Sequence, residues 1–230
     1  IDLDDLRDQG NTDLKSITRY EPGISVFDPR DSGNYRGTTS TGNLNIRGMR
    51  KNRILSIQDG IRLPAGYYGS GYDYSNNDIV DYFSLKTIDI LKGPASSLYG
   101  SDALGGVLSF NTLTVDDLLE EGETIKYEFP AKFNSANDSV SGAGRVAYRD
   151  EESGLSFLAV VSKSSAENTK PNGSSDAYIN DAEISSNSAL FKVNKQIDPA
   201  NNIGFSIDTY SKDREIARSS GNLSTGFYNY

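Results

Sequence analysis

The chain has 230 residues, enough for two domains, and a formal net charge of −9, which argues against a general nucleic-acid-binding surface because such a surface needs a basic excess. It contains no cysteine and no histidine, which excludes disulfide bonds, zinc thiolate sites, thiol catalysis and a Ser-His-Asp triad. No stretch reaches the roughly 20 apolar residues of a membrane helix, and no signal peptide opens the sequence. We therefore expect a soluble protein, a protein that crosses a membrane as alternating strands, or one that has lost its leader.

The first third of the chain predicts short elements separated by polar loops. Residues 13–26 predict a short amphipathic helix, a turn at Glu21-Pro22-Gly23 and a strand. Residues 43–48 and 53–60 predict two further strands, the second of which ends in the turn-forming pair Asp59-Gly60. Residues 27–42 predict a polar, glycine-rich loop between them.

Residues 62–83 combine glycine with tyrosine and have no regular period, which predicts an exposed loop with adhesive aromatic side chains. Residues 84–93 predict a strand. The stretch ILKGPASSLYGSDALGGVLSFNT, residues 90–112, then places glycines and small residues between two strand-like segments, 88–91 and 107–110. Glycine lacks a Cβ and reaches positive φ, so this stretch predicts tight turns and close backbone approaches. It lacks the G-K-[ST] ending and the following helix of a phosphate-binding loop.

After residue 116 the polarity alternates with a period of two. In residues 124–133 one face carries Ile125, Tyr127, Phe129, Ala131 and Phe133, and the other carries Thr124, Lys126, Glu128 and Lys132. The alternation continues in residues 140–149, 155–162, 189–197 and 203–210, with tight links at 150–153 and 198–202 and a long polar link at 163–182. The pattern fits transmembrane β-barrel strands, but a soluble antiparallel sandwich shares the same period, so the pattern alone leaves both open.

Four motifs follow one another in the first half: YEPGISV at 20–26, NIRG at 45–48, NRIL with DGI at 52–61, and the glycine-rich stretch. Together they resemble the plug domain of TonB-dependent outer-membrane receptors. The motif positions are Gly48, Gly60, Gly93, Pro94, Tyr99, Gly100, Gly105 and Gly106.

The resemblance implies an α+β plug domain over residues 1–115, followed over residues 116–230 by the first about five antiparallel strands of a transmembrane β-barrel. The barrel of this family has about 22 strands. An open sheet would leave unpaired backbone groups in lipid, so we expect the chain to be a piece of a longer protein. In this family TonB grips a segment before the plug; residues 1–6 resemble the start of the plug itself, so we expect that segment to be absent here.

Within the family, residues 19–26, 45–64, 92–112 and 116–119 look most like the branch that takes up heme, often from hemoglobin, with transferrin and lactoferrin receptors nearby. This likeness implies a receptor, not an enzyme, in the outer membrane of a Gram-negative-type bacterium. It would bind heme, hemoglobin or another iron carrier outside the cell and import heme or iron into the periplasm. The energy would come from TonB and its inner-membrane proton-motive complex. The resemblance implies no built-in cofactor and no resident metal, since heme or an iron chelate is cargo, and its other partner is outer-membrane lipid.

Family members usually offer heme iron a histidine, which this chain lacks. Tyrosine can also ligate heme iron, so Tyr67, Tyr68, Tyr72 and Tyr74 are candidate ligand-binding residues of the loop expected to face outward. They could equally be contact aromatics for any ligand, and a histidine from barrel loops beyond this chain could serve instead.

The resemblance also implies a releasable latch between plug and barrel, formed by Arg47, Arg53 and Lys92 with barrel carboxylates. Lys92 stands where arginine is usual, which keeps the charge and loses bidentate geometry. The alternative for each is a solvated surface charge.

Three other functions stay open at this point. The first is a receptor of the same fold for a ferric siderophore, cobalamin or another chelate. The second is a soluble β-rich adhesion or carbohydrate-binding protein. An enzyme is the least supported, because paired carboxylates such as Glu120-Glu121 lie in irregular segments. The aspartates of residues 27–35 could bind calcium, but they match no EF-hand pattern and we interpret them as part of a plain polar loop.

Overall fold

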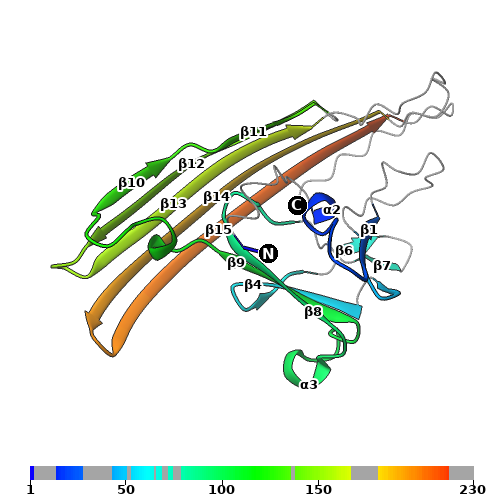
Figure 1. The fold of residues 1–230 in the computed structure, drawn as a ribbon, viewed down its shortest axis with the longest axis horizontal. Coiled ribbons are helices and arrows are strands. Elements are labelled where there is room, and N and C mark those ends of the chain that lie inside the picture. The colour runs from blue at the N-terminus through cyan, green and yellow to red at the C-terminus, as the bar shows by residue number, and fades with distance from the viewer. Residues whose placement is uncertain are drawn as a thin grey trace. The chain divides into compact units, whose positions relative to one another are not determined.

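The computed structural model describes residues 1–2, 14–27, 43–50, 53–64, 66–68, 72–74, 79–135, 138–166 and 181–217. The predicted polar loop from residue 28 on, with the calcium candidates, and residues 167–180 of the predicted long link lie outside this part. The chain divides into two compact units, Ile1–Thr112 and Leu113–Tyr230. Both are mostly sheet with few helices (Figure 1).

The first unit begins with a small three-stranded antiparallel sheet. Helix α2 (Leu14–Ile17) precedes β1 (Ile24–Phe27), which pairs with β2 (Asn43–Ile46), and β2 pairs with β3 (Met49–Arg50). This confirms the predicted order of helix, turn and strand. The predicted strand 43–48 is two residues too long, because Arg47 and Gly48 have φ values of 49° and 88° and form the turn into β3.

A four-stranded mixed sheet forms the centre of this unit. It contains β4 (Ile54–Gln58), β5 (Ile61–Arg62), β8 (Leu85–Lys92) and β9 (Gly106–Thr112) in the order β5-β4-β9-β8. Strand β9 runs parallel to β4 and antiparallel to β8. The two strands predicted at either end of the glycine-rich stretch are therefore confirmed as neighbours in one sheet.

Both faces of this sheet are buried. One face packs against α2 and β2 in a cluster of Leu14, Ile17, Leu44, Ile46, Ile54, Val80, Leu85, Ile88, Leu108 and Phe110. The other face contributes Leu55, Ile57 and Val107 to a smaller cluster that Ala95 and Ala103 of the glycine-rich stretch complete. The stretch thus covers the sheet as well as connecting two of its strands.

Two short strands lie where the sequence predicted an irregular loop. Strand β6 (Gly66–Tyr68) pairs with β7 (Tyr72–Tyr74), with Tyr68 opposite Tyr72. The prediction was wrong here because strands of three residues are too short to display a period, although tyrosine favours strands. A four-residue helix, α3 (Ser96–Tyr99), was likewise not predicted inside the glycine-rich stretch.

The second unit is a long, curved antiparallel sheet (Figure 1). Its strands are β10 (Ile125–Glu128), β11 (Ala131–Asn134), β12 (Ser139–Asp150), β13 (Leu155–Ala166), β14 (Asp181–Asp198) and β15 (Asn201–Ala217). Strands β10 and β11 pair with successive parts of β12. The prediction of one strand over 124–133 was wrong at Pro130, which has no N–H for the ladder. The carbonyl of Pro130 still accepts a 2.9 Å hydrogen bond from the Ala143 N–H.

The two faces of this sheet differ as the alternation predicts. We call the apolar face the one that exposes Ile125, Tyr127, Phe129, Phe133, Val140, Leu155, Val161, Phe191, Ile203, Phe205 and Ile207. The opposite face carries Ser141, Arg145, Ala147, Leu158 and Val160, all buried. Among the residues that the structure describes, no helix is long and apolar enough to span a membrane.

Strands β14 and β15 extend well beyond the predicted 189–197 and 203–210. Their pairing continues from Ala189 and Thr209 as far as Asp181 and Ala217. The predictions stopped where polar residues appear on both faces, but ladder hydrogen bonds join backbone groups and continue regardless of side-chain polarity.

The predicted tight turns at one end of the sheet are confirmed. In the turn at residues 198–202, the Asp198 carboxylate accepts hydrogen bonds from the Asn201 side chain and from the Ala200 and Asn201 N–H groups. These bonds, chiefly the one from the Asn201 side chain, hold the pKa of Asp198 below its ordinary value.

Candidate functional site

Three sequence motifs of the first unit meet around Lys92. The Lys92 ammonium donates to Glu21 Oε2 at 2.8 Å, and Arg47 Nη1 donates to the Lys92 carbonyl at 3.5 Å. The Arg47 N–H also donates to the Gly23 carbonyl at 2.9 Å. Residues 71 positions apart in sequence, Glu21 and Lys92, thereby connect the small sheet to the end of β8. We call Glu21, Arg47 and Lys92 the β8 clasp.

The three predicted latch residues have different surroundings within the first unit. Lys92 has a carboxylate partner in its own unit, Glu21, and its side chain is 23% exposed. Arg47 belongs to the same clasp. Arg53 is exposed, and its carbonyl accepts a 2.7 Å hydrogen bond from the Gly105 N–H. Pairing of Arg47, Arg53 or Lys92 with carboxylates of a barrel stays a prediction.

The glycine motif makes both the close approaches and the turns that its composition suggested. A Cβ on Gly105 would overlap the Met49 side chain, and a Cβ on Gly106 would overlap the Leu91 carbonyl oxygen. Positive φ occurs at Gly48, Gly60, Gly93 and Gly100. Pro94 is exposed and lies two residues before α3, and Tyr99 ends that helix.

Arg62 holds α3 and the following turn against β5. Its guanidinium forms an ion pair with Asp102, and Nη2 donates to the Tyr99 carbonyl at 3.3 Å. The Ala95 N–H donates to the Ala103 carbonyl at 2.8 Å, which closes the same loop. Tyr99 contacts Arg62 through its backbone carbonyl and not through its side chain. The loop therefore sets the position of Tyr99.

The Asp59-Gly60 turn is fastened to the end of β9. Asp59 Oδ1 accepts from the Thr112 N–H at 2.8 Å, and Oδ2 accepts from the Thr112 hydroxyl. Asp59 has a φ of 47°, and its own N–H donates to the Phe110 carbonyl. The last residue of the first unit is thus held in place.

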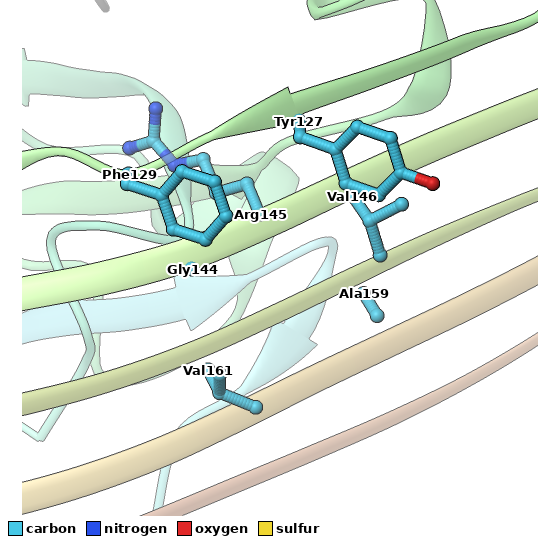
Figure 2. Close-up of a pocket in the computed structure, with 7 residues that line it drawn as sticks. All are labelled: Tyr127, Phe129, Gly144, Arg145, Val146, Ala159 and Val161. Atoms are coloured by element: carbon cyan, nitrogen blue, oxygen red, sulfur yellow. The ribbon is translucent and has the colours of Figure 1, made fainter.

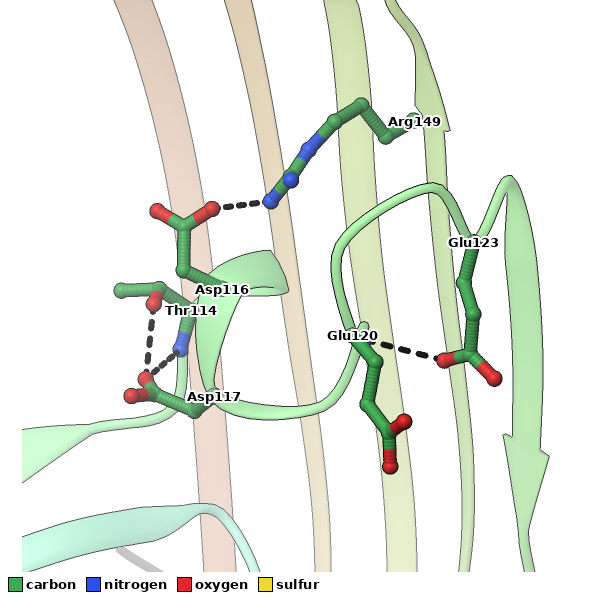
Figure 3. Close-up of polar contacts among 6 residues, drawn as sticks. All are labelled: Thr114, Asp116, Asp117, Glu120, Glu123 and Arg149. Carbon is green, nitrogen blue, oxygen red and sulfur yellow. Dashed lines mark hydrogen bonds and ion pairs between the residues drawn. The ribbon is translucent and has the colours of Figure 1, made fainter.

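The chain immediately after Thr112 is ordered by a capping box (Figure 3). Asp117 Oδ2 accepts from both the N–H and the hydroxyl of Thr114, each at 2.7 Å, around the short 3₁₀ helix η3 (Val115–Asp117). Asp116 forms an ion pair with Arg149 of β12, which ties this helix to the sheet. Leu113, Val115, Leu118 and Leu119 are buried. The segment before β10 is therefore an anchored start to the sheet.

Polar groups pair across the face of the sheet opposite the apolar face. Arg145, only 3% exposed at its side chain, forms an ion pair with Glu128 at 3.0 Å. The hydroxyls of Ser141 and Ser164 are 2.8 Å apart, and a second serine pair joins β13 to β14. A sheet with an exposed apolar face, and with paired polar groups on its other face, fits a barrel wall that has an outer lipid face.

The four candidate tyrosines all lie in β6 and β7, and the backbone register places Tyr67 opposite Asp73 and Tyr68 opposite Tyr72. Their role as ligand-binding residues stays a prediction. In the described part of the chain, no group of three or more acidic residues could hold a metal ion. The ion pairs Arg62–Asp102, Lys92–Glu21 and Arg149–Asp116 lie at partly exposed sites. Because ion pairs at such sites contribute little net stability, they offer reversible polar association.

Sequence reasoning missed the partners of the charged residues. Glu21, Asp102, Thr112 and Arg149 pair with residues 33 to 71 positions away. The signal within the sequence was that Glu21, Asp102 and Thr112 lie inside the motifs themselves.

Comparisons with known proteins agree with this architecture. Residues 1–107 match the family model described as TonB-dependent Receptor Plug Domain. Lactoferrin-binding protein A of Neisseria meningitidis serogroup B is 32% identical over 133 residues, which are 54% of this chain and 13% of that protein. The hemin receptor of Yersinia enterocolitica is 30% identical over 156 residues, which are 67% of this chain and 21% of that protein.

The FrpB iron transporter from Neisseria meningitidis, in its apoprotein form, has the same fold with a TM-score of 0.73 at 18% identity. The match covers 98% of this chain and 34% of that one, so this chain spans about a third or less of each of these proteins. Residues 1–107 thus belong to the plug-domain family of the TonB-dependent receptors, and the relatives and the fold agree with this assignment.

Proposed function

We propose that this chain is the N-terminal part of an outer-membrane receptor that imports heme, or iron from heme, with energy transmitted by TonB. The observation that carries the proposal is the likeness to a hemin receptor over two thirds of the chain. The receptor would bind heme or a heme protein outside a Gram-negative-type cell and release its cargo into the periplasm.

In this proposal residues 1–115 are the plug and residues 116–230 begin the barrel wall. The two-faced sheet supports a wall, because lipid requires an apolar outer surface and satisfied backbone groups. The buried sheet of the first unit supports a plug that stays folded until it is moved. TonB and its inner-membrane complex are the proposed energy source, and heme is cargo with no resident cofactor.

A second candidate cargo is iron taken from an iron-carrier protein. The likeness to lactoferrin-binding protein A at 32% identity favours it, although that match covers a smaller part of this chain. The two candidates share the fold and the energy source, and they differ in what the outer surface binds.

A growth experiment with the full-length receptor tests the proposal. A Gram-negative host without iron receptors of its own would express the receptor and receive hemin, hemoglobin, lactoferrin, transferrin or a ferric siderophore as the sole iron source, each with and without TonB. We expect growth on hemin or hemoglobin that needs TonB. Iron-limited growth on lactoferrin or transferrin alone would favour the second candidate, and growth on a siderophore alone would contradict both.

The tyrosine hypothesis has its own test with hemin absorption spectra of the full-length receptor. If one of Tyr67, Tyr68, Tyr72 or Tyr74 ligates iron, its replacement by phenylalanine should shift the Soret band. The same replacement at Tyr20, which is 78% exposed elsewhere on the first unit, is the matched control. Unchanged spectra for all four variants would leave the tyrosines as contact residues at most.

A further inference from the structure

The apolar face of the second unit contains a hollow of about 250 Å³ (Figure 2). Its floor is Gly144 and Val146 of β12, and its walls are Tyr127 and Phe129 on one side and Ala159 and Val161 on the other. The register explains the hollow: Gly144 lies opposite Val161, and Val146 lies between Tyr127 and Ala159. A missing side chain at Gly144 and a small one at Ala159 leave space between larger neighbours.

The apolar face continues beyond the hollow in both directions along β12. In one direction the rings of Tyr148 and Phe157 stack with centroids 5.1 Å apart. In the other direction the same face continues over Gly142, where an added Cβ would meet only the Pro130 carbonyl oxygen, at 3.7 Å. The residue opposite Gly142 is Lys163, which is exposed. In this direction the face therefore leads from the hollow to an exposed cation.

The lining is hydrocarbon. Arg145 also lines the hollow, but its guanidinium binds Glu128 and its side chain is 3% exposed. Of the four wall side chains only Tyr127 has a polar atom, so a polar ligand would lose its hydration in this hollow for at most one hydrogen bond. An alkyl chain loses nothing comparable, and it gains contact with aromatic and branched side chains.

We propose that the hollow binds one acyl chain of an anionic membrane lipid and that Lys163 binds the phosphate of the same molecule. Two residues along a strand span about 6.6 Å, so a headgroup at Lys163 lies one step from a chain that enters beside Val161. The residues directly opposite Lys163 are Gly142 and Asn187, both neutral, so no carboxylate is paired with it across the ladder.

This inference rests on the proposed function, because it requires the apolar face to lie in a bilayer. It goes beyond that function because it assigns lipid binding to one hollow of a wide apolar face and requires that the lipid headgroup be anionic. Lipid that merely surrounds the protein would contact Phe205 and Ile207 of β15 as often as the residues of the hollow.

The test uses the full-length receptor in phosphatidylcholine vesicles that contain a small fraction of phosphatidylglycerol with a photoreactive diazirine on one acyl chain. Peptide mapping after illumination locates the label. We expect the segments with Tyr127 to Phe129 and Ala159 to Val161 to carry several-fold more label than β15. Ala159→Phe fills the hollow and should remove this excess, whereas Ile207→Phe puts the same ring on the same face of β15, two strands from Ala159, and should keep it.

The headgroup is tested with Lys163→Gln and with a phosphatidylcholine probe that carries the same diazirine. Both changes should lower labelling of the hollow several-fold. Equal labelling of all strands, no effect of Ala159→Phe, or equal labelling by both probes would overturn the inference. Heat-modifiable migration and detergent-dependent extraction report separately whether the receptor is folded in the membrane. Loss of both in the unmodified receptor would instead contradict the proposed function.

Discussion

Lys92 and Glu21 form an ion pair with Nζ and Oε2 2.8 Å apart, and this pair joins the turn before β1 to the last residue of β8. The Glu21 side chain is 36% exposed, so solvent screens the attraction and the pair is easily broken. A contact of this kind positions two sheets of one unit without locking them together.

We expect the β8 clasp to contribute about 0–1 kcal/mol of coupling energy. Glu21→Gln, Lys92→Gln and the double variant of the full-length receptor form a mutant cycle, read by urea unfolding of the plug with a fluorophore at Ser97→Cys. The charge swap Glu21→Lys with Lys92→Glu should restore most of the loss. Arg50→Gln, also an exposed cation of this unit, is the control for charge alone. A coupling energy of several kcal/mol would show that the pair acts as a lock.

Gly106→Ala should destabilise the plug by about 1–3 kcal/mol, because the new methyl group overlaps the Leu91 carbonyl oxygen. Gly144→Ala is the matched control, since its methyl group would lie at ordinary contact distances from Val161 and Phe129. The control should be neutral or slightly stabilising, because alanine in a strand loses less backbone entropy on folding. Limited proteolysis of the folded receptor checks both, and equal resistance of the two variants would contradict the steric argument.

Asp59→Ala should cost about 1–3 kcal/mol, because it removes two hydrogen bonds to Thr112 and leaves a residue less tolerant of positive φ. Asp59→Asn should cost less, since asparagine adopts this conformation and can still accept from the Thr112 N–H. Amide hydrogen exchange at Thr112 measures the difference. Exchange as slow in the alanine variant as in the unmodified receptor would mean that β9 ends without help from this contact.

The two aspartates of η3 should behave differently although they are adjacent. Asp117→Ala removes the capping box and should cost about 0.5–2 kcal/mol, whereas Asp116→Ala removes an ion pair whose carboxylate is 81% exposed and should cost less than about 1 kcal/mol. Hydrogen exchange in residues 113–120 reports on both. A larger effect at Asp116 would mean that the contact with Arg149, not the cap, orders the start of the sheet.

Much of the fold could be predicted because its signals are local. The alternation from Ile125 to Phe133 reports which side chains share a face, and Asp59-Gly60 marks a turn wherever it occurs. The failures arose where local signals were weak. Strands β6 and β7 are too short for a period, and strands β14 and β15 continue as backbone ladders after their polarity stops alternating.

The sequence by itself determined the order of the plug motifs, the two faces of the long strands and the need for glycine between β8 and β9. Each follows from a property of a residue or of its near neighbours. Only the tertiary structure decided that Glu21 meets Lys92, that Asp59 holds Thr112 and that Gly144 opens a hollow beside Phe129. These contacts join strands far apart in the chain, and their geometry depends on sheet register and chain reversal, which no single segment encodes.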